Sequence, residues 1–222
     1  MAGAVGRVGE ALLNEVLARG GYDTVYALAD LPMSLGVRRL SLTTLDALPA
    51  LADVFIALTD PEDADARSFY GRDAAFTPVT VANVSHIAER AAAAGARRLA
   101  LVHPLPAWQQ MSRFHSGLVG EAELAIAGLP LDSVVVLRPV APSRLPVGNW
   151  LQRVANVYLS LQLLMVPRSI PTVTSVELAR VTVSALREAR PGIHVLGAAQ
   201  IDERARRPAP DAGVRPDARR EG

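Results

Sequence analysis

The chain has 222 residues, half of them hydrophobic, which is enough for one domain with a sizeable core. Its net charge of +1 argues against a nucleic-acid partner or binding to an anionic membrane surface. Cysteine is absent, which excludes disulfides, thiolate metal sites and cysteine nucleophiles and fits a reducing cytoplasm. All 23 basic residues are arginine, so no mechanism can use a lysine side chain. The chain opens without a signal-peptide pattern, and we expect a cytoplasmic protein.

Glycines dominate the first turn of the chain. Gly3, Gly6 and Gly9 form a GxxGxxG spacing, and the apolar pattern after them predicts a helix over residues 8–19. In a dinucleotide-binding fold a buried strand precedes such a loop, but only two residues stand before Gly3 here. We therefore expect the first strand to be missing from this sequence and the true start to lie upstream. The alternative is a real truncation, which would put nucleotide binding in doubt.

Strand-like and helix-like runs alternate up to residue 140. The expected elements are strands over residues 24–28, 38–42, 54–58, 98–103 and 134–137, and helices over residues 79–94 and 108–127. Long crossovers between strands are typical of parallel pairing with helices on both faces. The sequence thus predicts an α/β fold over residues 1–140, a doubly wound parallel sheet of Rossmann-like type that lacks its first strand.

The last third of the chain changes character after a proline-rich loop. Residues 141–200 are expected to form a small C-terminal helical lobe packed on the first domain. Its first apolar stripe, over residues 150–166, contains too many polar residues and is too short for a membrane span. Thr174 and Glu177 have capping-box spacing ahead of a second helix.

The end of the chain is expected to contain one more strand and a tail. Residues 193–196 have the composition of a strand. Residues 203–222 are mostly Arg, Pro, Ala, Asp and Gly, which predicts a disordered tail.

The glycine loop and one acidic residue together indicate a nucleotide site. Glycines allow a tight turn and a close approach of the backbone to a diphosphate, and the following helix offers unpaired N–H groups to it. Asp30 lies two positions past the next strand, where a carboxylate accepts hydrogen bonds from a ribose. The alternatives are a chance turn at the glycines and, for Asp30, a solvated turn acid before Pro32.

Several segments, in matching order and spacing, resemble the atypical short-chain dehydrogenase/reductases. They cover about residues 2–196 and read GAVGRVGEALLNEVLARGGYDTVYAL, ADVFIAL, GARRLALVH, VGEAELAIAGLPLDSVVVLRP and IPTVTSVELARVTVSAL. The similarity is greatest to the NAD(P)-binding branch that includes the Tat-interactive oxidoreductase. The resemblance implies a Rossmann fold that binds NAD or NADP.

The resemblance also implies a set of cofactor contacts. Asp30 would repel a 2′-phosphate and accept from a free 2′-hydroxyl, which favours NAD over NADP. Thr59 follows the strand over residues 54–58 and would face the ribose. The cofactor-binding residues that we expect are Gly3, Val5, Gly6, Arg7, Val8, Gly9, Asp30, Leu58 and Thr59.

The family's catalytic serine, tyrosine and lysine have no counterparts at the matching positions. The serine end of the fifth strand reads Leu101-Val102-His103-Pro104, the tyrosine position is His115 and the lysine position is Val119. His115 could exchange a proton near neutral pH, but a partly exposed helix histidine is the alternative. His103 is a second weak catalytic candidate, because the carboxyl ends of parallel strands face the ligand crevice.

We therefore expect a dinucleotide-binding protein without the family's usual catalysis, such as a redox-state sensor or a scaffold. An active oxidoreductase or epimerase-like enzyme that uses substituted residues on an unknown small molecule is one alternative. A degenerate interaction module that binds no nucleotide is another. No metal site is expected, because no two of the four histidines have the spacing of a helical metal pair. No oligomeric state is predicted.

Overall fold

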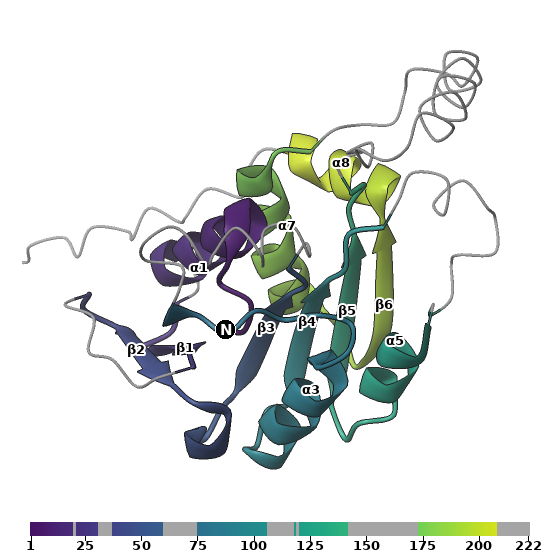
Figure 1. Ribbon diagram of the computed structural model, residues 1–222. Coiled ribbons are helices and arrows are strands. Elements are labelled where there is room, and N and C mark those ends of the chain that lie inside the picture. The colour runs from purple at the N-terminus through teal and green to yellow at the C-terminus, as the bar shows by residue number, and fades with distance from the viewer. Residues whose placement is uncertain are drawn as a thin grey trace, which may run out of the picture.

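A single parallel sheet forms the centre of the computed structural model (Figure 1). The structure describes residues 1–19, 21–30, 37–59, 75–105, 118, 120–141 and 173–207. Four strands pair in the order β3-β4-β5-β6, all parallel, with bounds β3 Asp53–Ala57, β4 Arg98–Val102, β5 Ser133–Arg138 and β6 Gly192–Gly197. A separate parallel pair consists of β1 (Val25–Leu28) and β2 (Leu40–Thr43).

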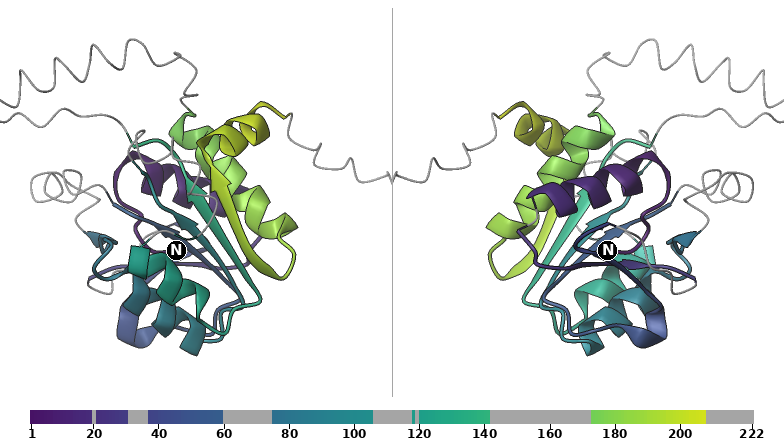
Figure 2. Two further views of the ribbon diagram at one scale, coloured as in Figure 1. Left: turned by 90° about the vertical axis from the view of Figure 1, so that its right-hand side faces the viewer. Right: turned by 90° about the vertical axis from the view of Figure 1, so that its left-hand side faces the viewer.

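Helices cover both faces of the four-stranded sheet, as Figure 2 shows from two sides. One face carries α1 (Gly6–Arg19), α7 (Ser175–Glu188) and α8 (Ala198–Arg206); the other carries α3 (Val84–Ala93) and α5 (Gly120–Ala127). Because successive side chains of a strand point to opposite faces, Phe55 enters the core under α1 and α7 while Ile56 enters the core under α3 and α5. The predicted doubly wound, Rossmann-like α/β fold is confirmed.

Local sequence explains the strongest elements. All six residues of β5 are buried, as expected for an apolar, β-branched run covered by helices on both faces. The predicted capping box is present at the start of α7. The Glu177 N–H donates to Thr174 Oγ1 at 3.2 Å, and the Thr174 N–H donates to Glu177 Oε2 at 2.9 Å. These two bonds satisfy backbone donors that a helix start leaves open.

The C-terminal region belongs to the same layers as the first domain. β6 pairs with β5 along its whole length, and α7 packs against α1 and the sheet. Residues 173–207 therefore complete the sheet and one of its helical layers, where the sequence predicted a small lobe packed on the first domain. The rest of that expected lobe, with its apolar stripe, lies outside the described residues.

The tail begins later than predicted, because residues 203–206 belong to α8. Ile201 and Ala205 lie one turn apart on the buried side of this helix, and Asp202 pairs with Arg206 at 2.9 Å on its exposed side. The arginine-rich composition hid this short amphipathic pattern. Residues 208–222 lie outside the described part of the chain.

Met1 and Ala2 occupy the position between the two sheets. The Ala2 N–H donates to the Phe55 carbonyl at 2.8 Å, and the Ala57 N–H donates to the Ala2 carbonyl at 3.1 Å. On the other side the Leu28 N–H donates to the Met1 carbonyl at 2.9 Å, and the Met1 ammonium donates to the Tyr26 carbonyl at 2.6 Å. The spatial order is thus β2, β1, residues 1–2, β3, β4, β5 and β6, with two residues where a full strand would fit.

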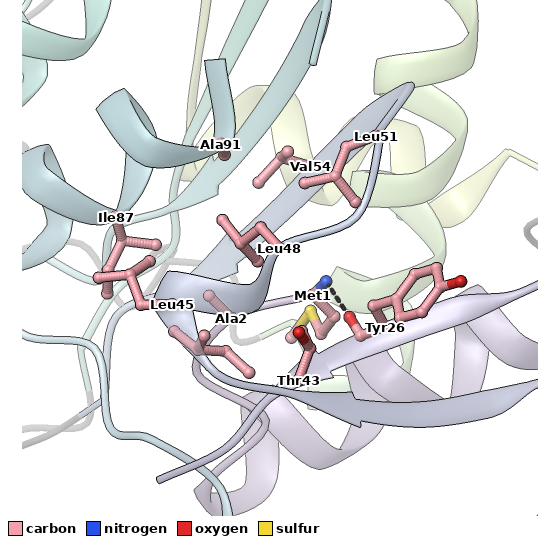
Figure 3. A pocket seen from close by; sticks show the side chains of 11 residues that line it. Met1, Ala2, Tyr26, Thr43, Leu45, Leu48, Leu51, Val54, Ile87 and Ala91 are labelled. Carbon is pink, nitrogen blue, oxygen red and sulfur yellow. Dashed lines mark hydrogen bonds between the residues drawn. The ribbon is translucent and has the colours of Figure 1, made fainter. Parts of the chain in front are cut away.

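A small apolar cavity of about 30 Å³ lies beside this two-residue joint (Figure 3). Leucines around the 3₁₀ helix η1 (Leu45–Ala47) and the side chains of Ile87 and Ala91 on α3 form its wall. The α-amino group of Met1 is buried here, and desolvation lowers its pKa to about 5. The joint therefore combines incomplete packing with a titratable group in an apolar setting.

Candidate nucleotide and acid–base sites

The glycine loop runs from the end of the Met1–Ala2 segment into α1. Gly3 has a φ of +73°, and a Cβ there would lie 2.0 Å from the Ala57 carbonyl oxygen. Gly6 has a φ of +67° at the first residue of α1. Gly9 lies within α1, where a Cβ would come within 2.1 Å of the Gly3 carbonyl oxygen. Glycine is thus favoured at each position for a physical reason. Gly3 and Gly6 have left-handed backbone angles, and Gly9 allows a close contact between helix and loop.

The other predicted loop residues divide into buried and exposed. Val5 is buried in the core under α1 and α7, and Val8 packs against the same core. Arg7 is exposed in the first turn of α1, which contains no acidic residue. A helix start leaves its first N–H groups without intrahelical partners and carries partial positive charge. Backbone amides and the Arg7 guanidinium are therefore the groups that this turn can offer to an anion.

Asp30 lies at the carboxyl end of β1 and is exposed. Its Oδ1 accepts a hydrogen bond from the Thr77 hydroxyl at 2.7 Å, and its N–H donates to the Ala75 carbonyl at 3.1 Å. The segment before α3 therefore holds the aspartate in place. A solvated acid in a turn would not need these two hydrogen bonds.

A cavity of about 240 Å³ opens beside Asp30. Its volume is below the roughly 300–1,000 Å³ of a pocket for a complete drug-sized ligand, so it suits one part of a larger molecule. Its wall contains the polar residues Thr44, Thr77 and Asn83 as well as apolar ones. The lining residues are Leu28, Ala29, Asp30, Thr44, Leu45, Thr77, Asn83, His86 and Ile87.

Leu58 and Thr59 follow β3 and are both buried. The Leu58 N–H donates to the Val102 carbonyl at 3.0 Å, which extends the pairing of β3 with β4. The Thr59 hydroxyl accepts from the Val79 N–H at 3.2 Å, and the Thr59 N–H donates to the Val79 carbonyl at 2.7 Å. In this structure the Thr59 side chain therefore fixes the segment that leads to α3, while its contact with a ribose stays a prediction.

His103 belongs to a buried charged cluster at the carboxyl ends of β4 and β5. Its Nδ1 lies 2.7 Å from Glu123 Oε1, on α5. The Arg138 guanidinium, at the end of β5, donates to the same carboxylate through Nη2 to Oε2 and through Nε to Oε1 at 3.3 Å. The side chains of Glu123 and Arg138 are 0% and 2% exposed, whereas that of His103 is 14% exposed. The cluster thus leads from a buried ion pair to one partly exposed imidazole.

Sequence reasoning singled out His103 by its place at a strand end but missed its two partners. Glu123 occupies an inward position of α5 beside Ala122 and Ile126, and Arg138 ends the fully buried β5. The signal that could have found them is a charged residue at a position that the apolar pattern assigns to the core. His115 and Val119, the matching tyrosine and lysine positions, lie outside the described residues.

No protein-family model matches the chain, and a search of curated proteins found no match. Within the described ranges, no helix combines the length and apolar character needed to cross a bilayer. Over those same ranges no three metal-binding side chains gather in one place.

Proposed function

We propose that this protein binds a dinucleotide, NAD or NADP, along the edge formed by the glycine loop and the end of β1. The diphosphate would lie against the first turn of α1, and the adenosine would enter the cavity beside Asp30. The observation that carries the proposal is that backbone geometry requires glycine at all three positions of the loop. Gly3 and Gly6 have positive φ, and a side chain at Gly9 would overlap the loop. A dinucleotide-binding turn needs its glycines for a tight turn, close backbone approach and helix packing.

NAD is the preferred cofactor in this proposal. A carboxylate at the end of the strand accepts hydrogen bonds from ribose hydroxyls and repels a 2′-phosphate. Asp30 is exposed, lines the cavity and is oriented by Thr77. These features support selection against NADP.

The absence of lysine supports a binding role without the serine–tyrosine–lysine catalysis of the similar family. In that chemistry a lysine lowers the tyrosine pKa so that the phenol can exchange a proton. We therefore propose a nucleotide sensor or scaffold as the leading function. The second candidate is an enzyme that uses substituted residues, and the specific observation in its favour is the His103–Glu123–Arg138 cluster.

Isothermal titration calorimetry and thermal unfolding with NAD, NADH and NADP test the binding proposal. Saturation at 100 times the dissociation constant would stabilise the folded chain by about 2.7 kcal/mol. NAD is expected to bind more tightly than NADP, and Asp30→Ser is expected to narrow or reverse this difference. Asp23→Ser, an exposed acid in the turn before β1, is the matched control and should leave the preference unchanged. If none of the three dinucleotides binds at millimolar concentration, the binding proposal is wrong. The alternative, an interaction module that binds no nucleotide, would then be the function.

A further inference from the structure

We propose that His86 determines how strongly this site rejects NADP, and that its charge makes the preference for NAD depend on pH. The neutral imidazole leaves the repulsion between Asp30 and a 2′-phosphate unopposed, whereas the imidazolium offsets it. This inference rests on the proposed dinucleotide binding. It goes beyond that proposal by assigning a specificity-determining residue on α3 and a condition that changes which cofactor binds.

His86 lies in the wall of the cavity of about 240 Å³ that opens beside Asp30. Asn83, His86 and Ile87 line one side of this cavity, because residues three and four apart at the start of α3 share a helix face. Asp30 lines it from the end of β1. The imidazole and the carboxylate therefore belong to the same small space and come from two different elements.

Two other polar side chains of the wall are already bound within the chain. Asn83 Oδ1 accepts from the Thr80 N–H at 2.8 Å, and Asn83 Nδ2 donates to the Pro78 carbonyl at 3.1 Å. The Thr77 hydroxyl donates to Asp30 Oδ1 at 2.7 Å. Neither side chain can turn to a ligand without losing a bond that holds the segment before α3.

The His86 imidazole and the Thr44 hydroxyl are the groups of the wall that remain for a ligand. Within the part of the chain that the structure describes, neither side chain makes a hydrogen bond or an ion pair. Of the two, only the imidazole gains a charge on protonation. The electrostatic character of the cavity can therefore change at His86 without any movement of the backbone.

The other charged groups near His86 lie outside the cavity wall. Glu89 and Arg90 follow it on α3, and both are exposed. Arg90 pairs with Asp46 of η1 at 3.7 Å, where the Asp46 side chain is 99% exposed. Water and salt screen exposed pairs of this kind. Among the described residues, Asp30 and His86 are thus the ionisable groups that the cavity itself presents to a ligand.

The charge of His86 acts on NADP more than on NAD. Histidine is the side chain that gains a proton near neutral pH. The resulting imidazolium attracts a 2′-phosphate, whereas NAD offers only a hydroxyl at this position and its diphosphate lies further away. Because the protonated ring favours the bound phosphate, NADP binding takes up protons at this ring. The contribution of His86 to NADP affinity therefore falls as pH rises.

Calorimetric titration of the full chain with NAD and NADP at pH 5.5 and pH 8 tests the assignment. The quantity compared is the NADP dissociation constant divided by the NAD dissociation constant. His86→Asn keeps a hydrogen-bonding side chain without the charge, and His86→Arg carries a charge at both pH values. The 2′-phosphate also titrates in this range, but it does so in every chain, so the comparison between chains isolates residue 86.

At pH 5.5 the ratio for the parent chain is expected to be about tenfold lower than for His86→Asn, and at pH 8 the two should agree within about twofold. The ratio for His86→Arg should be lower than for His86→Asn at both pH values. His194→Asn, on β6 at the opposite edge of the sheet, is the matched control and should behave as the parent chain. Because His86 is exposed, these chains should have similar melting temperatures without ligand.

The outcomes separate the two proposals. Equal ratios for the parent chain and His86→Asn at pH 5.5 would overturn the role of His86 and leave dinucleotide binding intact. The same conclusion would follow if NAD binds and NADP binds at neither pH, or if His86→Arg rejects NADP as strongly as His86→Asn. Failure of both NAD and NADP to bind would overturn the proposed function and this inference together.

Discussion

At the scale of single residues, backbone geometry and close contacts decide where the loop before α1 needs glycine. Spacing alone placed Gly3, Gly6 and Gly9 in a tight turn ahead of a helix, and their backbone angles and contacts account for all three. Glu123 and Arg138 are 15 residues apart in the chain, and they meet only because α5 covers the end of β5. No local pattern encodes a contact of that kind.

Gly9→Ala tests whether the helix and loop need their close approach. Alanine usually stabilises a helix interior by up to about 1 kcal/mol relative to glycine. Here the new Cβ would lie 2.1 Å from the Gly3 carbonyl oxygen, so we expect a net loss of about 1–3 kcal/mol in the free energy of unfolding. Urea denaturation measures this change.

Gly128→Ala is the matched control, because a Cβ there meets only ordinary contacts of 3.5 Å or more. Its stability should stay within about 0.5 kcal/mol of the parent chain. Equal stability of the two variants would mean that α1 can move away from the loop.

At the scale of elements, apolar periodicity predicted the strands and the long helices. It did not predict the residues at which the elements begin and end. The helix expected from residue 79 begins only at Val84, because Asn83 Oδ1 accepts from the Thr80 N–H at 2.8 Å and holds a turn there. α8 was missed because arginine-rich composition outweighed the two buried positions, Ile201 and Ala205. Packing on a neighbouring element decides such short helices, and packing cannot be read from one segment.

Thr174→Ala tests how far the capping box stabilises α7. The substitution removes the acceptor of the Glu177 N–H, and we expect a loss of about 1 kcal/mol in unfolding free energy. The Glu177 carboxylate keeps the hydrogen bond from the backbone N–H of residue 174, which is the largest cause of its lowered pKa, and loses the one from the Thr174 hydroxyl. Val176→Ala, at a side chain in the same turn that is 66% exposed, should cost little. Chemical denaturation of both variants gives the comparison, and equal losses would assign the effect to helix propensity instead of the cap.

At the scale of the whole molecule, the stability of the 222-residue chain is expected to depend on the state of the Met1 amino group. Burial lowers its pKa from 8.0 to about 5. Between these values the unfolded chain holds a proton that the folded chain has lost, so the free energy of unfolding should rise as pH rises from 5 to 8. The rise from this group is at most about 4 kcal/mol.

Urea denaturation of the 222-residue chain at pH 5.5, 7 and 8.5 measures that dependence. Acetylation of the amino group removes its titration, so the acetylated chain should show a flatter profile over the same window. Superimposable profiles for the free and acetylated chains would mean that the ammonium keeps access to water in the folded state.

The narrow joint at Met1 and Ala2 is also expected to divide the cooperativity of the domain. The β1–β2 pair could detach in a partial opening that costs less than global unfolding, whereas Gly3 is anchored beside β3. Asp30, which follows β1, would move with this pair only if its hydrogen bonds to Thr77 and Ala75 also broke. A molecule that bound both the glycine turn and Asp30 would oppose this partial opening. Protection of the β1 amides from hydrogen exchange should therefore increase with the fraction of protein that is bound.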